Sequence, residues 1–156
     1  MCGRTGNRQP TRNMASIHRH ALVRHSAVRM FGLVNDVARY PQRFSWCEGS
    51  KVLEQSNQHM LARLDLRVAG FAVGFTTLNT LQAPTRISLQ LQEGPFSEFK
   101  GEWFFNPLAD DACKVSLTLD FEVASRLIGS AMAIGFQGLA DRMVDDFCRE
   151  ADLNDD

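Results

Sequence analysis

Apolar and polar residues alternate one by one through much of the middle of the chain. In residues 59–68, Met60, Leu64 and Val68 occupy one side of the alternation, and Arg63 and Asp65 occupy the other. A period of two is typical of a β-strand that buries one face. The pattern predicts further strands over residues 17–23, 51–55, 71–77, 85–91, 99–106 and 113–123.

Short turn signals separate these strands. Ala69-Gly70, Ala83-Pro84 and Gly94-Pro95 are typical turn dipeptides, and a further turn is expected over residues 107–111. Because the connections are short, the strands should form consecutive hairpins with one apolar face. This arrangement is typical of an antiparallel sheet that is covered on one side.

Two helical segments are expected between the first and the second strand. Ser26 is a suitable N-cap, and apolar residues follow it at helical spacing. Pro41 disfavours a helical conformation at the preceding residue, Tyr40. We therefore expect the first helix to end before this point, and a short second helical turn to occupy residues 42–44.

A long helix is predicted from Ser125 to about Glu150. The apolar stripe that should face the sheet consists of Ile128, Met132, Phe136, Leu139, Met143 and Phe147. Gly129, Gly135 and Gly138 interrupt this helix, although glycine disfavours a helix by roughly 1 kcal/mol relative to alanine. We expect the glycines to allow close packing against the sheet; the alternative is that they leave room for a ligand.

The order of elements is one strand, two helices, six strands and one long helix. It predicts an α+β helix-grip fold of the START/Bet v 1-like type, in which a curved antiparallel sheet wraps around the long C-terminal helix. Residues 14–151 are expected to form this domain. Residues 1–13 are polar and basic, and we interpret them as a disordered tail or an over-extended start, with Met14 as the alternative first residue. Residues 152–156 are interpreted as an acidic tail.

Composition argues against a membrane-spanning protein and against a disulfide framework. Although 44% of the 156 residues are hydrophobic, no apolar run approaches the ~18–20 residues that cross a bilayer. The N-terminal residues lack the apolar core of a signal peptide, so we expect a cytoplasmic protein. Cys2, Cys47, Cys113 and Cys148 have no C-x-x-C spacing, which favours free, mostly buried and unreactive thiols.

The net charge of −1 hides an uneven distribution of charged residues. Residues 1–60 hold nine Lys and Arg and three Asp and Glu, a net of +6, whereas residues 61–156 hold eight and fifteen, a net of −7. A basic face for RNA or anionic lipid would explain the arginines of the first part. Because these arginines are dispersed, we favour an ordinary solvated surface, and we expect no DNA binding.

The sequence contains no recognisable catalytic or metal-binding motif. His18 and His20 would share one face of the first strand, but no paired cysteine or carboxylate accompanies them. We expect no metal and interpret these residues, with His25, as surface histidines. Asp120 and Glu122 fall on the solvent side of the last strand, where carboxylate pKa values are rarely adjusted for catalysis. We predict no catalytic residue and a protein that is not an enzyme.

The inward face of the predicted sheet and helix is rich in aromatic residues and methionine. Such a set can form an ordinary core, which the pattern alone favours, or it can line a pocket for an apolar ligand. A strongly curved sheet that grips one helix favours a cavity between them. The residues expected to line this cavity are Phe71, Phe75, Phe96, Trp103, Phe105, Met132, Phe136, Leu139 and Met143.

Several short motifs occur in a defined order along the chain. They are Tyr40-Pro41-x-x-Phe44-x-Trp46-Cys47, Gly94-Pro95-Phe96, Gly101-x-Trp103-x-Phe105-x-Pro107-Leu108, Cys113-Lys114-Val115 and Leu119-Asp120-Phe121-Glu122, followed by the long helix. In these motifs the chain resembles the coenzyme Q-binding START-like family of the polyketide cyclase/dehydrase-like superfamily, over residues 16–151. This family includes the mitochondrial coenzyme Q chaperone and bacterial RatA-type ribosome association toxins. Arg43, Ser45 and Leu78 depart from the family pattern, which bears on ligand or partner specificity rather than on the fold.

The resemblance implies two functions of different classes. One is the non-enzymatic binding of ubiquinone or a similar isoprenoid lipid in support of respiration. This function implies a bound lipid but no cofactor, and it implies transient contact with a membrane surface. The other is a toxin that binds the large ribosomal subunit, blocks its joining to the small subunit and inhibits the initiation of translation. Polyketide cyclase or aromatase activity is known on related folds, but no catalytic group in the sequence supports it. We expect lipid binding first, with the ribosomal function as its alternative.

Overall fold

A computed structural model of the chain describes residues 14–124 and 129–153. In this part of the chain seven strands form one antiparallel sheet with the order β2-β8-β7-β6-β5-β4-β3. The strands are β2 (Ala15–Val23), β3 (Cys47–Gln55), β4 (His59–Val68), β5 (Phe71–Gln82), β6 (Arg86–Glu93), β7 (Phe96–Ala109) and β8 (Ala112–Val123). The helices are α1 (Ala27–Asn35), the 3-10 turn η1 (Val37–Arg39), α2 (Tyr40–Arg43) and α3 (Gly129–Leu153).

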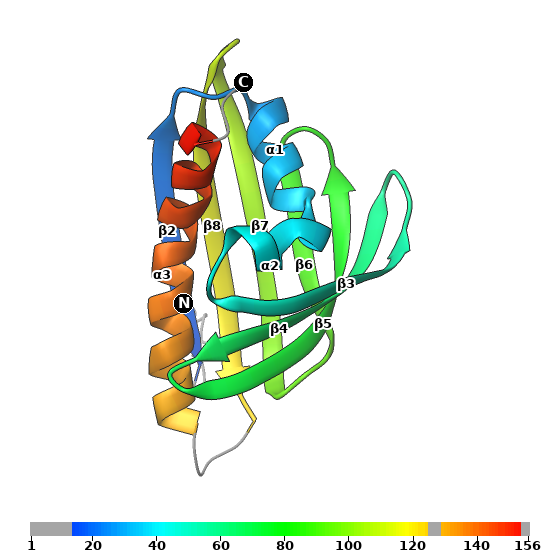
Figure 1. The fold of residues 1–156 in the computed structure, drawn as a ribbon, viewed down its shortest axis with the longest axis vertical. Coiled ribbons are helices and arrows are strands. Elements are labelled where there is room, and N and C mark those ends of the chain that lie inside the picture. The colour runs from blue at the N-terminus through cyan, green and yellow to red at the C-terminus, as the bar shows by residue number, and fades with distance from the viewer. Residues whose placement is uncertain (1–13, 125–128, 154–156) are drawn as a thin grey trace, which may run out of the picture.

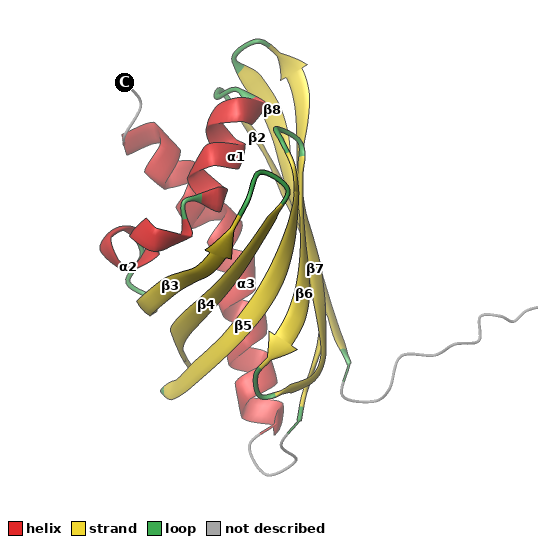
Figure 2. Cartoon of the chain, turned by 90° about the vertical axis from the view of Figure 1, so that its right-hand side faces the viewer, coloured by secondary structure: helices red, strands yellow, loops and turns green. Residues whose placement is uncertain are grey.

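The sheet curves around α3, which lies along β2 and β8 (Figure 1). Strands β3, β4 and β5 cross in front of the other strands and reach back towards this helix. Figure 2 shows α1, α2 and α3 on the same side of the sheet, and none of the described helices lies on the other side. The predicted helix-grip fold, with a curved antiparallel sheet around the C-terminal helix, is confirmed.

The segment between β2 and β3 begins as predicted and then differs. Ser26 caps α1, and its side chain accepts a backbone hydrogen bond from the first turn. The prediction that Tyr40 is not helical is wrong, because Tyr40 has φ −53° and ψ −44° and begins α2. Pro41 lies in the first turn of α2, where its missing N–H costs no helical hydrogen bond. β3 then begins at Cys47 rather than at residue 51.

β7 is longer at both ends than the alternation predicted. It begins at Phe96, and a register shift with β8 between Phe96 and Glu98 brings Phe96 and Phe99 to the same buried side. At the other end the strand continues through Pro107, where the register shifts again between Pro107 and Ala109. The shift leaves Leu108 without a partner in the ladder, whereas Pro107 is still paired with Cys113. These two irregularities explain why the alternation with a strict period of two predicted a shorter strand, over residues 99–106 only.

β5 extends to Gln82, five residues beyond the predicted end at Thr77. Thr77 and Asn79 occupy inward positions of this strand and are buried. The strand prediction depends on apolar residues at inward positions and polar residues at outward positions, and this difference is lost where inward positions are polar. The prediction therefore stopped where the inner face of the sheet becomes polar.

The described part of α3 directs the predicted stripe towards the sheet. Its residues Met132, Phe136, Leu139 and Phe147 are buried, and Met143 is half-buried. The predicted start of the helix at Ser125 and the stripe residue Ile128 lie outside the described residues. The helix continues to Leu153, three residues beyond its predicted end.

The C-terminal end of α3 contacts the loop before α1. Asp152, which we assigned to an acidic tail, lies in the last turn of the helix, and its Oδ1 is 2.7 Å from Nε2 of His25. His25 is only 5% exposed, so its interpretation as a surface histidine is wrong. Arg29 donates a hydrogen bond to the backbone oxygen of Ala151 at 2.9 Å. Together these contacts anchor the end of α3 to the start of α1.

The glycines of α3 have different surroundings. A Cβ at Gly135 would lie 2.5 Å from Cβ of Ala69, in the turn between β4 and β5. Gly135 therefore allows this hairpin to reach the helix. A Cβ at Gly138 would meet nothing within 4 Å. The close packing predicted for these glycines is thus confirmed at Gly135 and wrong at Gly138, while the surroundings of Gly129 lie outside what the structure describes.

A cluster of aromatic rings joins α2 and the segment before β3 to α3. Phe147 is fully buried, and its ring centroid lies 4.6 Å from that of Phe44 and 5.4 Å from that of Tyr40. Nε1 of Trp46 donates to Oδ2 of Asp146 at 2.9 Å. Because Phe44, Trp46 and Phe147 all pack against the ring of Tyr40, tertiary contacts outweigh the local preference that Pro41 imposes.

We expect the substitution Phe147→Ala to lower the free energy of unfolding by about 3–5 kcal/mol, because it leaves a cavity among packed rings. Urea denaturation measures this change. Ile134→Ala is the matched control on the same helix, since Ile134 is 72% exposed, and it should change the free energy by no more than about 0.5 kcal/mol. A Phe147→Ala variant as stable as the control would contradict the structural role of this cluster.

Candidate functional site

A cavity of about 70 Å³ lies between the inner face of the sheet and the helices. Its aromatic lining residues are Tyr40, Phe75, Phe99, Trp103 and Phe136. Its aliphatic and thioether lining residues are Val34, Val37, Ala62, Leu64, Leu66, Ile87, Leu89, Leu117, Leu119 and Met143. The strands β4 to β8 thus form one wall, and α1, η1, α2 and α3 form the other. An apolar enclosure of this kind is suited to an apolar ligand.

Three neutral polar side chains, Asn35, Thr77 and Asn79, join this lining. Oγ1 of Thr77 donates a hydrogen bond to Oδ1 of Asn79 at 2.7 Å, and both residues belong to β5. Asn35 is the last residue of α1. Its Oδ1 is buried and has no hydrogen-bond partner among the described residues. The cavity therefore contains a few polar groups in an otherwise apolar surface.

Tyr40 is the one titratable side chain among the lining residues, and its hydroxyl donates a hydrogen bond to the backbone oxygen of Val34. Burial raises the pKa of the Tyr40 phenol above its usual range. A phenol that stays protonated at neutral pH is a poor general base. The cavity is therefore better suited to binding than to acid–base chemistry.

Four of the nine residues predicted to line a cavity do line it, namely Phe75, Trp103, Phe136 and Met143. Phe96, Phe105, Met132 and Leu139 are buried in the core but are not lining residues, and Phe71 is partly buried against the core. Their participation in ligand binding stays a prediction. The sequence interpretation missed Tyr40, Asn35, Thr77 and Asn79. The spacing of Thr77 and Asn79 from Phe75 and Leu81 was a usable signal, because residues two apart on a strand share a face.

The volume of the cavity limits what it holds in this conformation. About two water molecules would fill 70 Å³, whereas pockets for drug-sized ligands usually measure about 300–1,000 Å³. A larger ligand therefore requires the walls to move. Leu64, Leu89 and Met143 are the half-buried members of the apolar lining, and methionine adapts readily to new shapes.

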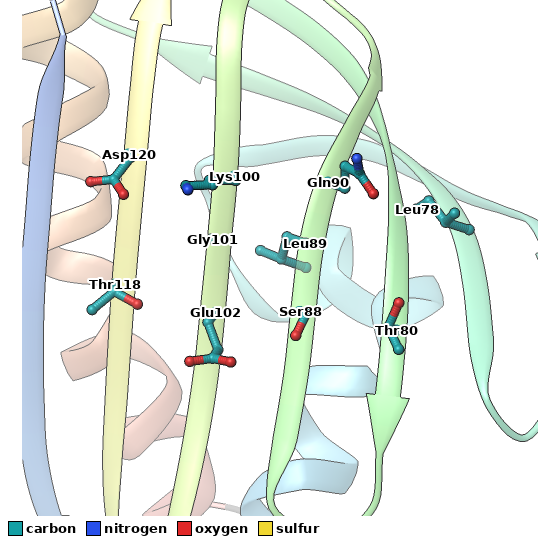
Figure 3. A pocket seen from close by; sticks show the side chains of 10 residues that line it. All are labelled: Leu78, Thr80, Ser88, Leu89, Gln90, Lys100, Gly101, Glu102, Thr118 and Asp120. Atoms are coloured by element: carbon teal, nitrogen blue, oxygen red, sulfur yellow. The ribbon is translucent and has the colours of Figure 1, made fainter. Parts of the chain in front are cut away.

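A larger hollow of about 450 Å³ lies on the opposite, outer face of the sheet (Figure 3). Its polar lining residues are Thr80, Ser88, Gln90, Lys100, Glu102, Thr118 and Asp120, from the neighbouring strands β5, β6, β7 and β8. This hollow is open to solvent. A small molecule bound there would stay exposed on one side, so we consider the inner cavity the stronger candidate.

The thiols of the described residues are unsuited to nucleophilic chemistry. Cys47, Cys113 and Cys148 are free. Burial raises the pKa of Cys47 and of Cys148 to about 11, and it also raises the pKa of Cys113. A thiol that stays protonated at neutral pH reacts slowly. Free thiols are thus confirmed for these three cysteines, whereas Cys2 lies outside the described residues.

The histidines of the first strand do not form part of a metal site in the described structure. His18 and His20 are exposed on β2. Among residues 14–124 and 129–153, no group of three or more His, Cys, Asp or Glu side chains could hold a metal ion. None of the described helices is long and apolar enough to cross a bilayer.

Comparison with solved structures identifies the same fold in proteins of low sequence identity. The aromatase/cyclase Zhui of Streptomyces superposes with a TM-score of 0.81 at 19% identity, covering 89% of this chain and 94% of that one. A START superfamily protein of Mycobacterium smegmatis superposes with a TM-score of 0.69 at 24% identity, covering 86% and 92%. At these identities the likeness concerns the fold alone.

Sequence comparison places the chain in a family. The family described as "Polyketide cyclase / dehydrase and lipid transport" matches residues 23–148. A protein of Vibrio cholerae named ribosome association toxin RatA is 48% identical over 138 residues, which cover 88% of this chain and 96% of that protein. The RatA protein of Escherichia coli is 42% identical over 134 residues, covering 86% and 85%. The chain therefore belongs to the polyketide cyclase/dehydrase and lipid transport family and, within it, to the RatA group.

Proposed function

We propose that this protein associates with ribosomes as a non-enzymatic binding protein. The observation that carries this proposal is the 48% identity to the Vibrio cholerae ribosome association toxin, which extends over nearly the whole length of both chains. A relative of Pseudomonas aeruginosa with the same name is 41% identical over 86% of this chain. In its finer form the proposal is that the protein binds the large subunit and blocks its joining to the small one. Such a role is carried out in the cytoplasm.

The distribution of charge indicates how such a contact would be made. Seven arginines of the described chain lie within 4.0 Å of a carboxylate, namely Arg19, Arg39, Arg43, Arg63, Arg67, Arg86 and Arg149. A guanidinium that is paired within the protein is less available to a phosphate. We therefore expect the described surface to contact the ribosome through complementary shape and hydrogen bonds rather than through a dense basic patch.

The first test is co-sedimentation. We expect the purified protein to sediment with isolated large ribosomal subunits and to lower the yield of joined subunits in a sucrose gradient. The Vibrio cholerae relative serves as the reference and small subunits serve as the control. A protein that stays in the supernatant with large subunits, under conditions in which the reference sediments, would contradict the proposal.

The second test is the dependence of this binding on salt. Proteins that make about 6–10 phosphate contacts with a duplex lose roughly 10³–10⁵-fold in affinity between about 50 and 200 mM salt. Because most of the described arginines are paired internally, we expect a loss of no more than about tenfold for this protein. Equilibrium binding at graded salt concentrations measures the slope. A steep slope would show that unpaired basic residues dominate the contact.

A second candidate function, which does not exclude the first, is the binding of ubiquinone or a similar isoprenoid lipid. Its support is the enclosed apolar cavity with aromatic walls and few polar groups. A protein that loads such a lipid would also meet a membrane surface transiently. Polyketide cyclase activity has weaker support, because the lining contains no carboxylate, imidazole or thiol among the described residues.

Filling the cavity tests this second function. Ala62 is buried in the lining, and Ala62→Leu adds three carbon atoms to a space of about 70 Å³. We expect lipid extracted from the wild-type protein, purified from quinone-replete cells, to contain a quinone or isoprenoid by mass spectrometry, and the variant to have lost it. Ala72→Leu, at an exposed position of β5, is the control and should retain the lipid. Wild-type protein without such a lipid would count against the function, as would equal lipid content in Ala62→Leu.

A further inference from the structure

Among the polar side chains that line the cavity, one hydrogen-bond acceptor lacks a partner within the described part of the chain. Thr77 and Asn79 satisfy each other, because Oγ1 of Thr77 donates to Oδ1 of Asn79 at 2.7 Å. Oδ1 of Asn35 is buried and has no partner among the described residues. A buried acceptor without a hydrogen bond is unfavourable to the folded state. Its presence in a cavity lining indicates a group that donates to it when the cavity is occupied.

Much of the cavity wall is aromatic. Phe75 lies 5.3 Å from Phe99 and 6.2 Å from Phe136 between ring centroids, and all three line the cavity. Tyr40 and Trp103 complete the aromatic part of the lining. Aromatic rings pack favourably on one another in edge-to-face and offset arrangements. A planar aromatic ring is therefore the ligand shape that these walls favour.

We propose that the cavity binds an aromatic ring that carries a hydroxyl group, and that Oδ1 of Asn35 accepts the hydrogen bond from that hydroxyl. The ligand class is a phenol or a hydroquinone, in preference to a quinone or an aryl ether of the same size. Quinone carbonyls and ether oxygens only accept hydrogen bonds, so they leave Oδ1 of Asn35 unsatisfied. This inference rests on the proposed function of the cavity and adds a preference for one chemical and redox form of the ligand.

The space for such a ring comes from movement of the apolar wall. A cavity of about 150 Å³ accepts a benzene molecule in another protein, whereas this one measures about 70 Å³. Met143 is half-buried at the edge of the lining and has a flexible, unbranched side chain. Because Met143 belongs to α3, a change of its rotamer would enlarge the cavity without moving β5, which carries Thr77 and Asn79.

Two probes of nearly equal size test the inference. 4-Fluorophenol donates a hydrogen bond, and 4-fluoroanisole does not. In fluorine NMR titrations of the full-length protein we expect 4-fluorophenol to bind at least about tenfold more tightly, because the anisole leaves a buried acceptor unpaired. Both probes should lose binding in Ala62→Leu, which identifies the cavity as their site.

Asn35→Leu should reduce the preference for 4-fluorophenol to about one, because its side chain has no acceptor. Asn57→Leu is the control at an exposed position between β3 and β4, and it should keep the wild-type preference. If Asn35→Leu does not fold, Asn35→Ala replaces it with the same expected result. A folded Asn35 variant that keeps the preference would assign Asn35 a purely structural role and overturn the inference.

The outcomes separate the inference from the function on which it rests. Equal binding of the two probes by the wild type would overturn the acceptor role of Asn35 while the cavity remained a binding site. Tighter binding of 4-fluoroanisole would show that Asn35 presents its NH₂ group to the cavity, which also overturns the inference. If neither probe binds, the cavity function itself fails, and the inference fails with it.

Discussion

The apolar inner face of the curved sheet must be covered, and this requirement organises the rest of the molecule. One helix is too narrow to cover seven strands. α3 therefore covers the side formed by β2 and β8, while α1 packs against β6, β7 and β8 and α2 packs against the edge strand β3 (Figure 1). The rings of Phe147, Phe44 and Tyr40 join the two groups of helices into one layer. At the opposite end of α3, Gly135 lets the hairpin of β4 and β5 approach the helix closely.

The cavity lies between the inner face of the curved sheet and the helices that cover it. Most of that space is filled by aromatic rings, so the remaining volume is small. The polar residues Asn35, Thr77 and Asn79 are placed where a core would ordinarily be apolar. Thr77 and Asn79 hydrogen-bond to each other, and Asn35 is the group that the proposed ligand would engage.

The two candidate functions use different parts of the molecule. Ribosome association concerns the surface, where most of the described arginines pair with carboxylates and leave a mixed rather than a basic face. Lipid or phenol binding concerns the interior. Because α1 and α2 line the cavity on one side and face solvent on the other, movement of these helices upon ligand binding would also change the outer surface. A single chain can therefore carry both functions.

The sequence by itself determined the order of elements, the helix-grip fold and most inward-facing positions. These follow from local periodicity, since residues such as Leu66, Trp103 and Leu117 fall on the buried side of strands with a strict period of two. Prediction failed where periodicity does not report on the environment. At Phe96 and Pro107 a bulge changes the register, and at Thr77 polar residues occupy the inner face.

Tertiary structure alone decided which inward residues border a cavity and which fill the core. Phe75 and Phe136 line the cavity, whereas Phe96 and Phe105, with the same pattern in the sequence, are buried in the core without lining it. It also decided that Tyr40 is helical, that His25 is buried against Asp152 and that Oδ1 of Asn35 has no partner in the part of the chain that the structure describes. The physical reason is that the surroundings of a buried residue are formed by segments that are distant from it in the sequence. A pattern of hydrophobicity records which side of an element faces inward, but it does not record the shape of the space that it faces.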